Sequence, residues 1–75
     1  MKELIEYIAK TLVDDSSQVY VEEIVGARQI VYRLEVAPED MGRVIGKGGR
    51  VANAMRALLR VAAVRRGKRV ILEIG

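Results

Sequence analysis

Apolar residues recur at intervals of three and four over the first thirteen positions, which is the spacing of one face of a helix. The residues of this stripe are Leu4, Ile5, Ile8, Ala9, Leu12 and Val13. Charged side chains occupy much of the remaining surface, so an amphipathic helix with one buried stripe is predicted over residues 2–13. The polar run at residues 14–17 predicts a turn after this helix.

Two segments rich in β-branched residues follow, at residues 18–25 and 29–36, and their largely alternating pattern predicts strands. A short link, Gly26-Ala27-Arg28, separates them, so we expect an antiparallel hairpin. The apolar face of the second strand consists of Ile30, Tyr32, Leu34 and Val36. The first strand alternates less regularly because Glu22 and Glu23 are adjacent, which predicts a bulge or an edge position.

A short helix is predicted over residues 38–45, because Pro38 is well suited to the first position of a helix. Glu39 and Asp40 would then lie near the positive end of the helix dipole, where acidic side chains are favourable. The glycines within residues 46–49 disfavour a continuing helix. A break is therefore expected in the middle of this helical region.

Good helix formers fill residues 51–64 and predict a second, longer helix. Its apolar stripe is Val51, Met55, Leu58, Leu59 and Ala62. Cations and a glycine at residues 65–68 predict the end of this helix, and residues 70–74 read as a last strand. The order αββααβ predicts a single α+β domain over residues 1–75, with a three-stranded sheet and three helices packed on one face.

The composition fits one small folded domain, since 51% of the 75 residues are hydrophobic and 31% are charged. Neither cysteine nor histidine is present, which excludes thiol nucleophiles, thiolate metal sites and the usual general base. An enzyme, a cofactor and a small-molecule substrate are therefore not expected. No apolar run is long enough to span a membrane, and the N-terminus is charged, so we expect a cytoplasmic protein.

Positive charge is concentrated in the second half of the chain. Residues 1–37 carry four Lys or Arg and seven Asp or Glu, whereas residues 38–75 carry nine and three, so the net charges are −3 and +6. This asymmetry favours an anionic partner that meets the C-terminal half. Dispersed arginines that are simply solvated would give the same count, and that alternative stays open.

The segment VIGKGGRV, residues 44–51, places three glycines and two cations at the start of the longer helix. Glycine lets the chain turn sharply and lets a ligand backbone approach closely. Backbone amides at a helix N-terminus favour anions, and Lys47 and Arg50 add positive charge. Phosphate is therefore the natural ligand, although glycines are also common in a plain helix–helix turn.

Two other phosphate-binding motifs do not fit this segment. The nucleoside-triphosphate loop needs four residues between its glycines and Ser or Thr after the lysine, whereas three residues separate Gly42 from Gly46 and Gly48 follows Lys47. The dinucleotide-binding fingerprint needs a preceding strand and a third glycine, where this chain has a predicted helix and Val51. Both nucleotide-binding functions are excluded.

Gly46-x-x-Gly49 between two helices of an αββααβ chain resembles the KH domain in its second topology, in which the extra helix and strand precede the βααβ core. The resemblance covers the whole chain. The chain length, the N-terminal helix and the segment GRVANAMRALL are also similar to the small single-domain bacterial RNA-binding KH-domain protein A family. The resemblance implies a groove for about four single-stranded nucleotides, whose backbone the glycine loop clamps.

Carried onto this sequence, the resemblance implies RNA binding at Ile45, Gly46, Lys47, Gly48, Gly49 and Arg50. Helical spacing adds Asn53 and Arg56, because Arg50, Asn53, Arg56 and Arg60 fall on one side of the longer helix, opposite its apolar stripe. The loop and Arg50 would contact phosphates, and Ile45 would border the groove. Asn53 is expected to bond a base or sugar, and Arg56 with Arg60 to add long-range attraction. Ala52 departs from the family pattern, which has a larger aliphatic residue there.

Single-stranded RNA is thus the expected partner. The competing hypothesis is a protein-interaction module, in which the apolar helix face or an open strand edge pairs with another copy or another protein. The resemblance itself implies a companion KH-domain protein, a role as RNA chaperone or post-transcriptional regulator, and effects on cell shape and cell wall biogenesis.

Overall fold

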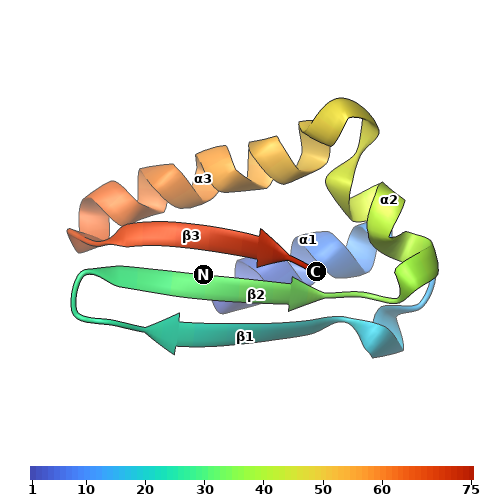
Figure 1. Cartoon of the computed structure of the whole chain (residues 1–75), viewed down its shortest axis with the longest axis horizontal. Helices are drawn as coiled ribbons and strands as arrows, with labels where there is room; N and C mark the ends of the chain where they lie inside the picture. Colours follow the sequence, from blue (N-terminus) through green and yellow to red (C-terminus); the bar gives the residue numbers. More distant parts are fainter.

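A three-stranded sheet organises the computed structural model, which describes residues 1–75 in full. Strands β1 (Tyr20–Val25), β2 (Gln29–Glu35) and β3 (Arg69–Ile74) lie in the order β1-β2-β3 (Figure 1). The hairpin makes β1 antiparallel to β2, as expected, whereas β3 runs parallel to β2. The parallel pairing follows from the helical segment between β2 and β3, which returns the chain to the same end of the sheet.

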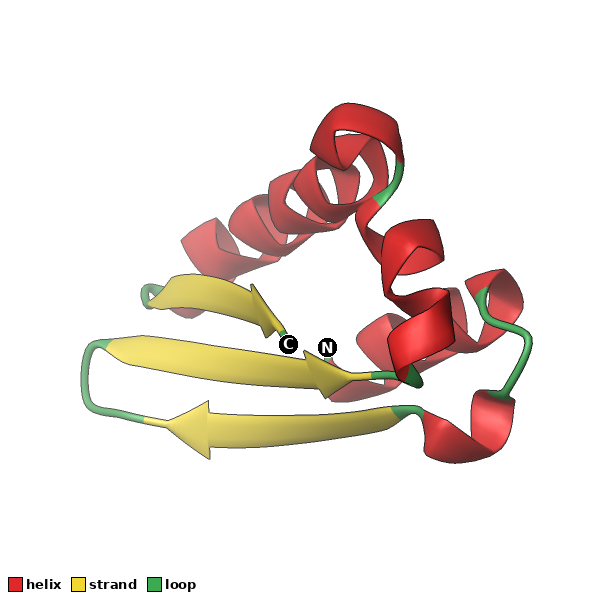
Figure 2. Cartoon of the chain, turned by 45° about the vertical axis from the view of Figure 1, so that its right-hand side comes forward, coloured by secondary structure: helices red, strands yellow, loops and turns green.

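The three helices cover one face of this sheet, as predicted (Figure 2). They are α1 (Lys2–Leu12), α2 (Met41–Ile45) and α3 (Arg50–Arg66). The helix predicted from Pro38 begins as a 3₁₀ turn, Pro38–Asp40, before α2 continues it. None of these helices has the length and apolar character that crossing a membrane requires.

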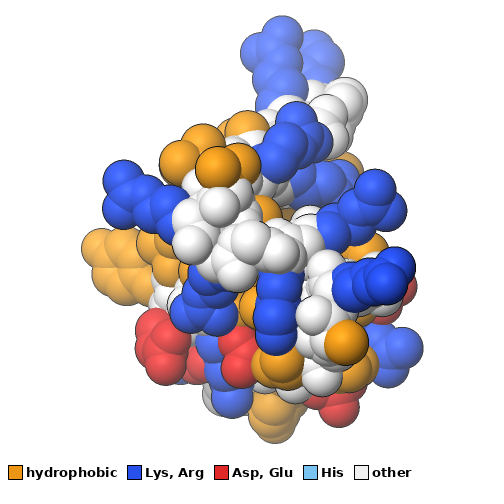
Figure 3. Space-filling model, turned by 90° about the vertical axis from the view of Figure 1, so that its left-hand side faces the viewer, with side chains coloured by type: hydrophobic (Ala, Val, Ile, Leu, Met, Phe, Trp, Pro, Cys, Tyr) orange, Lys and Arg blue, Asp and Glu red, His pale blue; other side chains and the backbone are white.

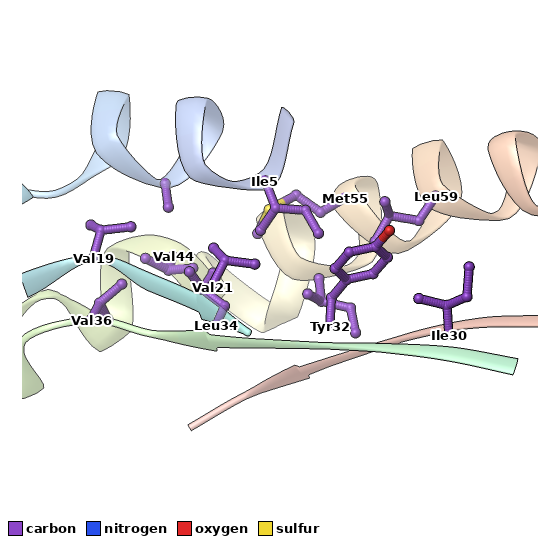
Figure 4. Close-up of a cluster of buried hydrophobic side chains, with 12 residues drawn as sticks. Ile5, Val19, Val21, Ile30, Tyr32, Leu34, Val36, Val44, Met55 and Leu59 are labelled. Atoms are coloured by element: carbon purple, nitrogen blue, oxygen red, sulfur yellow. The ribbon is translucent and has the colours of Figure 1, made fainter. Parts of the chain in front are cut away.

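The core lies between the helices and the inner face of the sheet. All four residues of the predicted apolar face of β2 and its end, Ile30, Tyr32, Leu34 and Val36, are buried. Figure 4 shows Ile5 of α1 and Met55 and Leu59 of α3 pointing toward this face. Burial of these side chains holds α3 on the sheet and so fixes the position at which this helix begins.

Strand β1 lies at the edge of the sheet, which confirms that prediction, but it carries no bulge. Its register is continuous from Tyr20 opposite Glu35 to Val25 opposite Ile30. The adjacent glutamates are accommodated because Glu22 forms an ion pair with Arg33 at 3.6 Å, whereas Glu23 accepts a hydrogen bond of 2.5 Å from the Tyr32 hydroxyl. Burial raises the pKa of Tyr32 to about 12, and the bond to Glu23 acts in the same direction.

The predicted apolar stripes are wrong at two positions. Leu58 is 54% exposed and Leu4 is 43% exposed. The buried line on α3 consists of Ala52, Met55, Leu59 and Ala63. Leu58 lies about 100° around the helix from Leu59, so its side chain falls beyond the edge of the contact with the sheet. Helical spacing alone therefore does not separate Leu58 from the buried line beside it.

Asp40 plays a different part from the predicted one of an acid near a helix dipole. Its side chain is buried and accepts hydrogen bonds from the amides of Asp14 and Asp15 at 3.2 and 3.1 Å. Arg43 lies 3.9 Å from Asp40 and 3.0 Å from Asp14. These contacts fasten the turn after α1 to the start of α2, and thereby fix the direction from which α2 enters the glycine loop.

Candidate nucleic-acid interface

The connection between α2 and α3 is a single 3₁₀ turn, Lys47–Gly49, preceded by Gly46. The φ angles of Gly46, Gly48 and Gly49 are 76°, 66° and 82°, and no residue other than glycine in the chain has a positive φ. Residues other than glycine rarely adopt such φ angles. The glycines therefore allow a reversal between two helices that most sequences could not make.

Gly46 and Gly48 serve this loop in different ways. A Cβ atom on Gly46 would lie 2.7 Å from Val51 Cγ2 and 2.9 Å from the Val51 amide nitrogen. A Cβ atom on Gly48 would meet nothing within 4 Å. Gly46 thus lets α2 approach the first turn of α3, whereas Gly48 leaves an open surface that a ligand can approach closely.

The N-terminus of α3 faces this open surface without a protein anion. Gly49 is its N-cap, no side chain caps the helix, and no acidic residue lies in its first turn. Lys47 and Arg50 are exposed, and neither forms an ion pair. Uncompensated cations beside a helix N-terminus favour an anion, such as a phosphate group.

The remaining predicted site residues lie around the loop and along α3. Ile45, just before the loop, is 37% exposed. Asn53 lies one turn into α3, with its Nδ2 atom 3.6 Å from the place of a Cβ on Gly49. The Arg56 guanidinium donates to Asn53 Oδ1 at 3.5 Å and to the Leu72 carbonyl at 3.4 Å. The structure thus brings Asn53 and Arg56 together, and Arg56 reaches across from α3 to β3.

The sequence does not predict the contact between Arg56 and the Leu72 carbonyl. The amides of Arg69 and Gly75 donate to β2 and its hairpin, at the carbonyls of Arg28 and Leu34, both at 3.1 Å. In a parallel pair alternate residues bond the neighbour, so Leu72 directs its carbonyl to the open edge of β3. The sequence predicted a strand here, but its open edge depends on strand order, which no local pattern contains.

Comparisons with known proteins point to one family. The family model described as "KhpA/KhpB, KH domain" matches residues 2–74. Proteins named RNA-binding protein KhpA from Caldanaerobacter subterraneus subsp. tengcongensis, Clostridium acetobutylicum and Clostridium perfringens are 55%, 54% and 51% identical to the chain over 74 residues, which are 99% of this chain and of each relative. No solved structure matches the chain. Because both the family model and these relatives span nearly its full length, the chain belongs to the KhpA/KhpB KH-domain family.

Proposed function

We propose that this chain binds single-stranded RNA in the cytoplasm, as an RNA chaperone or post-transcriptional regulator that holds the RNA backbone at residues 46–49. The names of its relatives support RNA as the ligand. The observation that carries the proposal is the exposed, glycine-lined turn at the uncapped start of α3. A KH glycine loop clamps the backbone of about four nucleotides, and this turn has the matching form.

Each residue of the site has a distinct part in the proposed complex. Lys47 and Arg50 neutralise phosphates that approach the open surface above Gly48. Ile45 offers an apolar border against which a base can lie. Asn53 bonds a base or a sugar, and the guanidinium of Arg56 lies at the open edge of β3, where a base would enter. Binding is therefore tolerant of sequence at the phosphates and selective only along α3.

Replacing Lys47 and Gly48 together by aspartate is expected to abolish RNA binding. The change brings two negative charges to the place proposed for the phosphates. The circular-dichroism spectrum should stay the same, because both side chains are exposed and aspartate tolerates a positive φ better than most residues. Fluorescence anisotropy with a labelled 12-nucleotide RNA measures the affinity.

The matched control is Lys47→Gln with Gly48→Asn, which makes the same conformational demand without negative charge. This control removes only the positive charge of Lys47, so it should weaken RNA binding only partly. Raising the salt concentration should also weaken the wild-type complex, because salt screens the same attraction. If the aspartate variant bound the 12-nucleotide RNA as tightly as the wild type, the proposed site would be wrong.

A second candidate function is association with another KH-domain protein or with a second copy of the chain. Helix α3 carries three exposed apolar side chains, Leu58, Val61 and Val64, which are 54%, 65% and 81% exposed. Leu58 and Val61 lie on the side of the helix away from the sheet, whereas Val64, one turn further on, borders the hollow between α3 and β3. An exposed apolar stripe of this kind is typical of a surface that a partner covers.

Replacing Val61 by aspartate tests this candidate, because it places a charge in the middle of the exposed stripe. The wild type is expected to sediment as a dimer with or without RNA, and the variant as a monomer. Sedimentation velocity over a range of protein concentrations measures both. A wild type that stayed monomeric throughout would contradict self-association, and a mixture with the companion KH-domain protein would then test the heterodimer.

A further inference from the structure

The end of the molecule opposite the glycine loop is where α3 ends and the β1–β2 hairpin turns (Figure 1), and Lys and Arg side chains gather there (Figure 3). We name this cluster the basic end, and it consists of Arg28, Arg60, Arg65, Arg66, Lys68 and Arg69. The hairpin and the start of β3 are joined here, since Lys68 Nζ donates to the Gly26 carbonyl at 3.3 Å and the Arg69 amide to the Arg28 carbonyl at 3.1 Å.

No ion pair offsets the charge of the basic end. None of its six cations forms an ion pair, and no Asp or Glu occurs between residues 41 and 72. The negative end of the α3 dipole amounts to roughly half an elementary charge, which accounts for only a small part of the excess. Since the whole chain has a net charge of +3, the rest of the molecule is net negative by the same amount.

This arrangement separates most of the positive charge from the proposed phosphate site. The α3 helix has 17 residues, so its two ends lie about 24 Å apart. Only Lys47 and Arg50 stand at the loop end of this helix. A ligand of about four nucleotides held at the loop would leave much of the basic end unused.

A hollow between α3 and β3 opens onto the basic end. Its volume is ≈ 520 Å³, and its lining consists of Arg60, Ala63, Val64, Gly67, Lys68, Arg69, Val70 and Ile71. Small aliphatic side chains offer a surface for bases, and the three cations in the lining offer partners for phosphates. Arg56, which bonds the Leu72 carbonyl, stands on the same α3–β3 seam between this hollow and the glycine loop.

We propose that a bound RNA strand continues from residues 46–49 along the seam between α3 and β3 and ends on the basic end. The inference rests on the proposed function and extends it, because the site then takes a strand longer than the four nucleotides of the loop. The loop fixes the strand at one end, and the basic end holds its phosphates at the other. Affinity must then grow with RNA length and with the number of phosphates neutralised.

The test compares a 4-nucleotide and a 12-nucleotide uridylate RNA on the full chain. Amide chemical shifts of residues 26–28 and 65–69 should change with the 12-mer but not with the 4-mer, whereas those of residues 46–50 should change with both. The 12-mer offers nine overlapping registers of four nucleotides, which alone would raise its affinity about ninefold over that of the 4-mer. We expect the affinity to rise by more than this factor.

Arg65→Gln with Arg69→Gln removes two exposed cations of the basic end, and Lys2→Gln with Lys10→Gln removes two exposed cations of α1 as the matched control. The first pair should weaken binding of the 12-mer about tenfold and reduce the slope of log affinity against log salt concentration by about 1.4. It should change the affinity for the 4-mer less than about twofold. The control pair should change either affinity less than about twofold.

Equal weakening of both RNAs by the Arg65 and Arg69 pair would overturn the inference, because the two cations would then act only by long-range attraction. An unchanged 12-mer affinity, or silent amides at residues 65–69, would overturn it as well. Failure of the proposed function is a different result, namely silent amides at residues 46–50 with either RNA.

Discussion

Replacing Gly46 by alanine is expected to lower the free energy of unfolding by about 2–5 kcal/mol and to weaken RNA binding with it. Gly46 has φ 76° and ψ 166°, a region that is occupied almost only by glycine. The added Cβ would also lie 2.7 Å from Val51 Cγ2 and 2.9 Å from the Val51 nitrogen, so α2 or the start of α3 must move. The loop that carries Lys47 would move with them.

Gly48→Ala is the control for this change. Gly48 has φ 66° and ψ 17°, and a Cβ there would meet nothing within 4 Å, so the variant has only the backbone strain of about 1–2 kcal/mol. Urea unfolding followed by circular dichroism measures the stabilities, and anisotropy with the 12-nucleotide RNA measures binding. Equal losses of stability and RNA affinity in the two variants would show that the close approach of Gly46 to Val51 does not shape the site.

The order of elements was predictable because each carries a local signal. Alternation identified the inner face of β2, the glycines identified the break between α2 and α3, and Gly67 with its flanking cations identified the end of α3. The contiguous part of the candidate site, residues 45–50, was found for the same reason. A short stretch of sequence already contains the turn, the charge and the helix start.

What the sequence could not provide are contacts between distant segments. Asp40 accepts from amides 25 and 26 residues earlier, and Arg56 bonds a carbonyl 16 residues later. The basic end joins Arg28 of the hairpin to Lys68 and Arg69 across the sheet. Such contacts depend on strand order and helix placement, which follow from packing the whole chain and not from any local spacing.

The same limit explains the misplaced apolar stripe on α3. Helical periodicity gives the direction of an apolar face only to within the width of that face, and Leu58 and Leu59 lie on its two sides. The sheet then selects one of the two, because Tyr32 and Leu34 already occupy its inner surface and Leu59 packs with them in the core. Leu58 is left on the outer stripe, beside Val61.

Leu59→Ala is therefore expected to lower the free energy of unfolding by about 2–5 kcal/mol, because Leu59 is 2% exposed and its loss leaves a cavity in the core. Leu58→Ala, the same change one residue earlier, should alter it by no more than about 0.5 kcal/mol, since Leu58 is 54% exposed. Urea unfolding at low protein concentration, where any dimer has dissociated, measures both variants on the monomer. If the two losses were equal there, the rotation of α3 on the sheet would be wrong. If Leu58→Ala were costly only at high concentration, its side chain would instead be covered by a second chain, as the second candidate function requires.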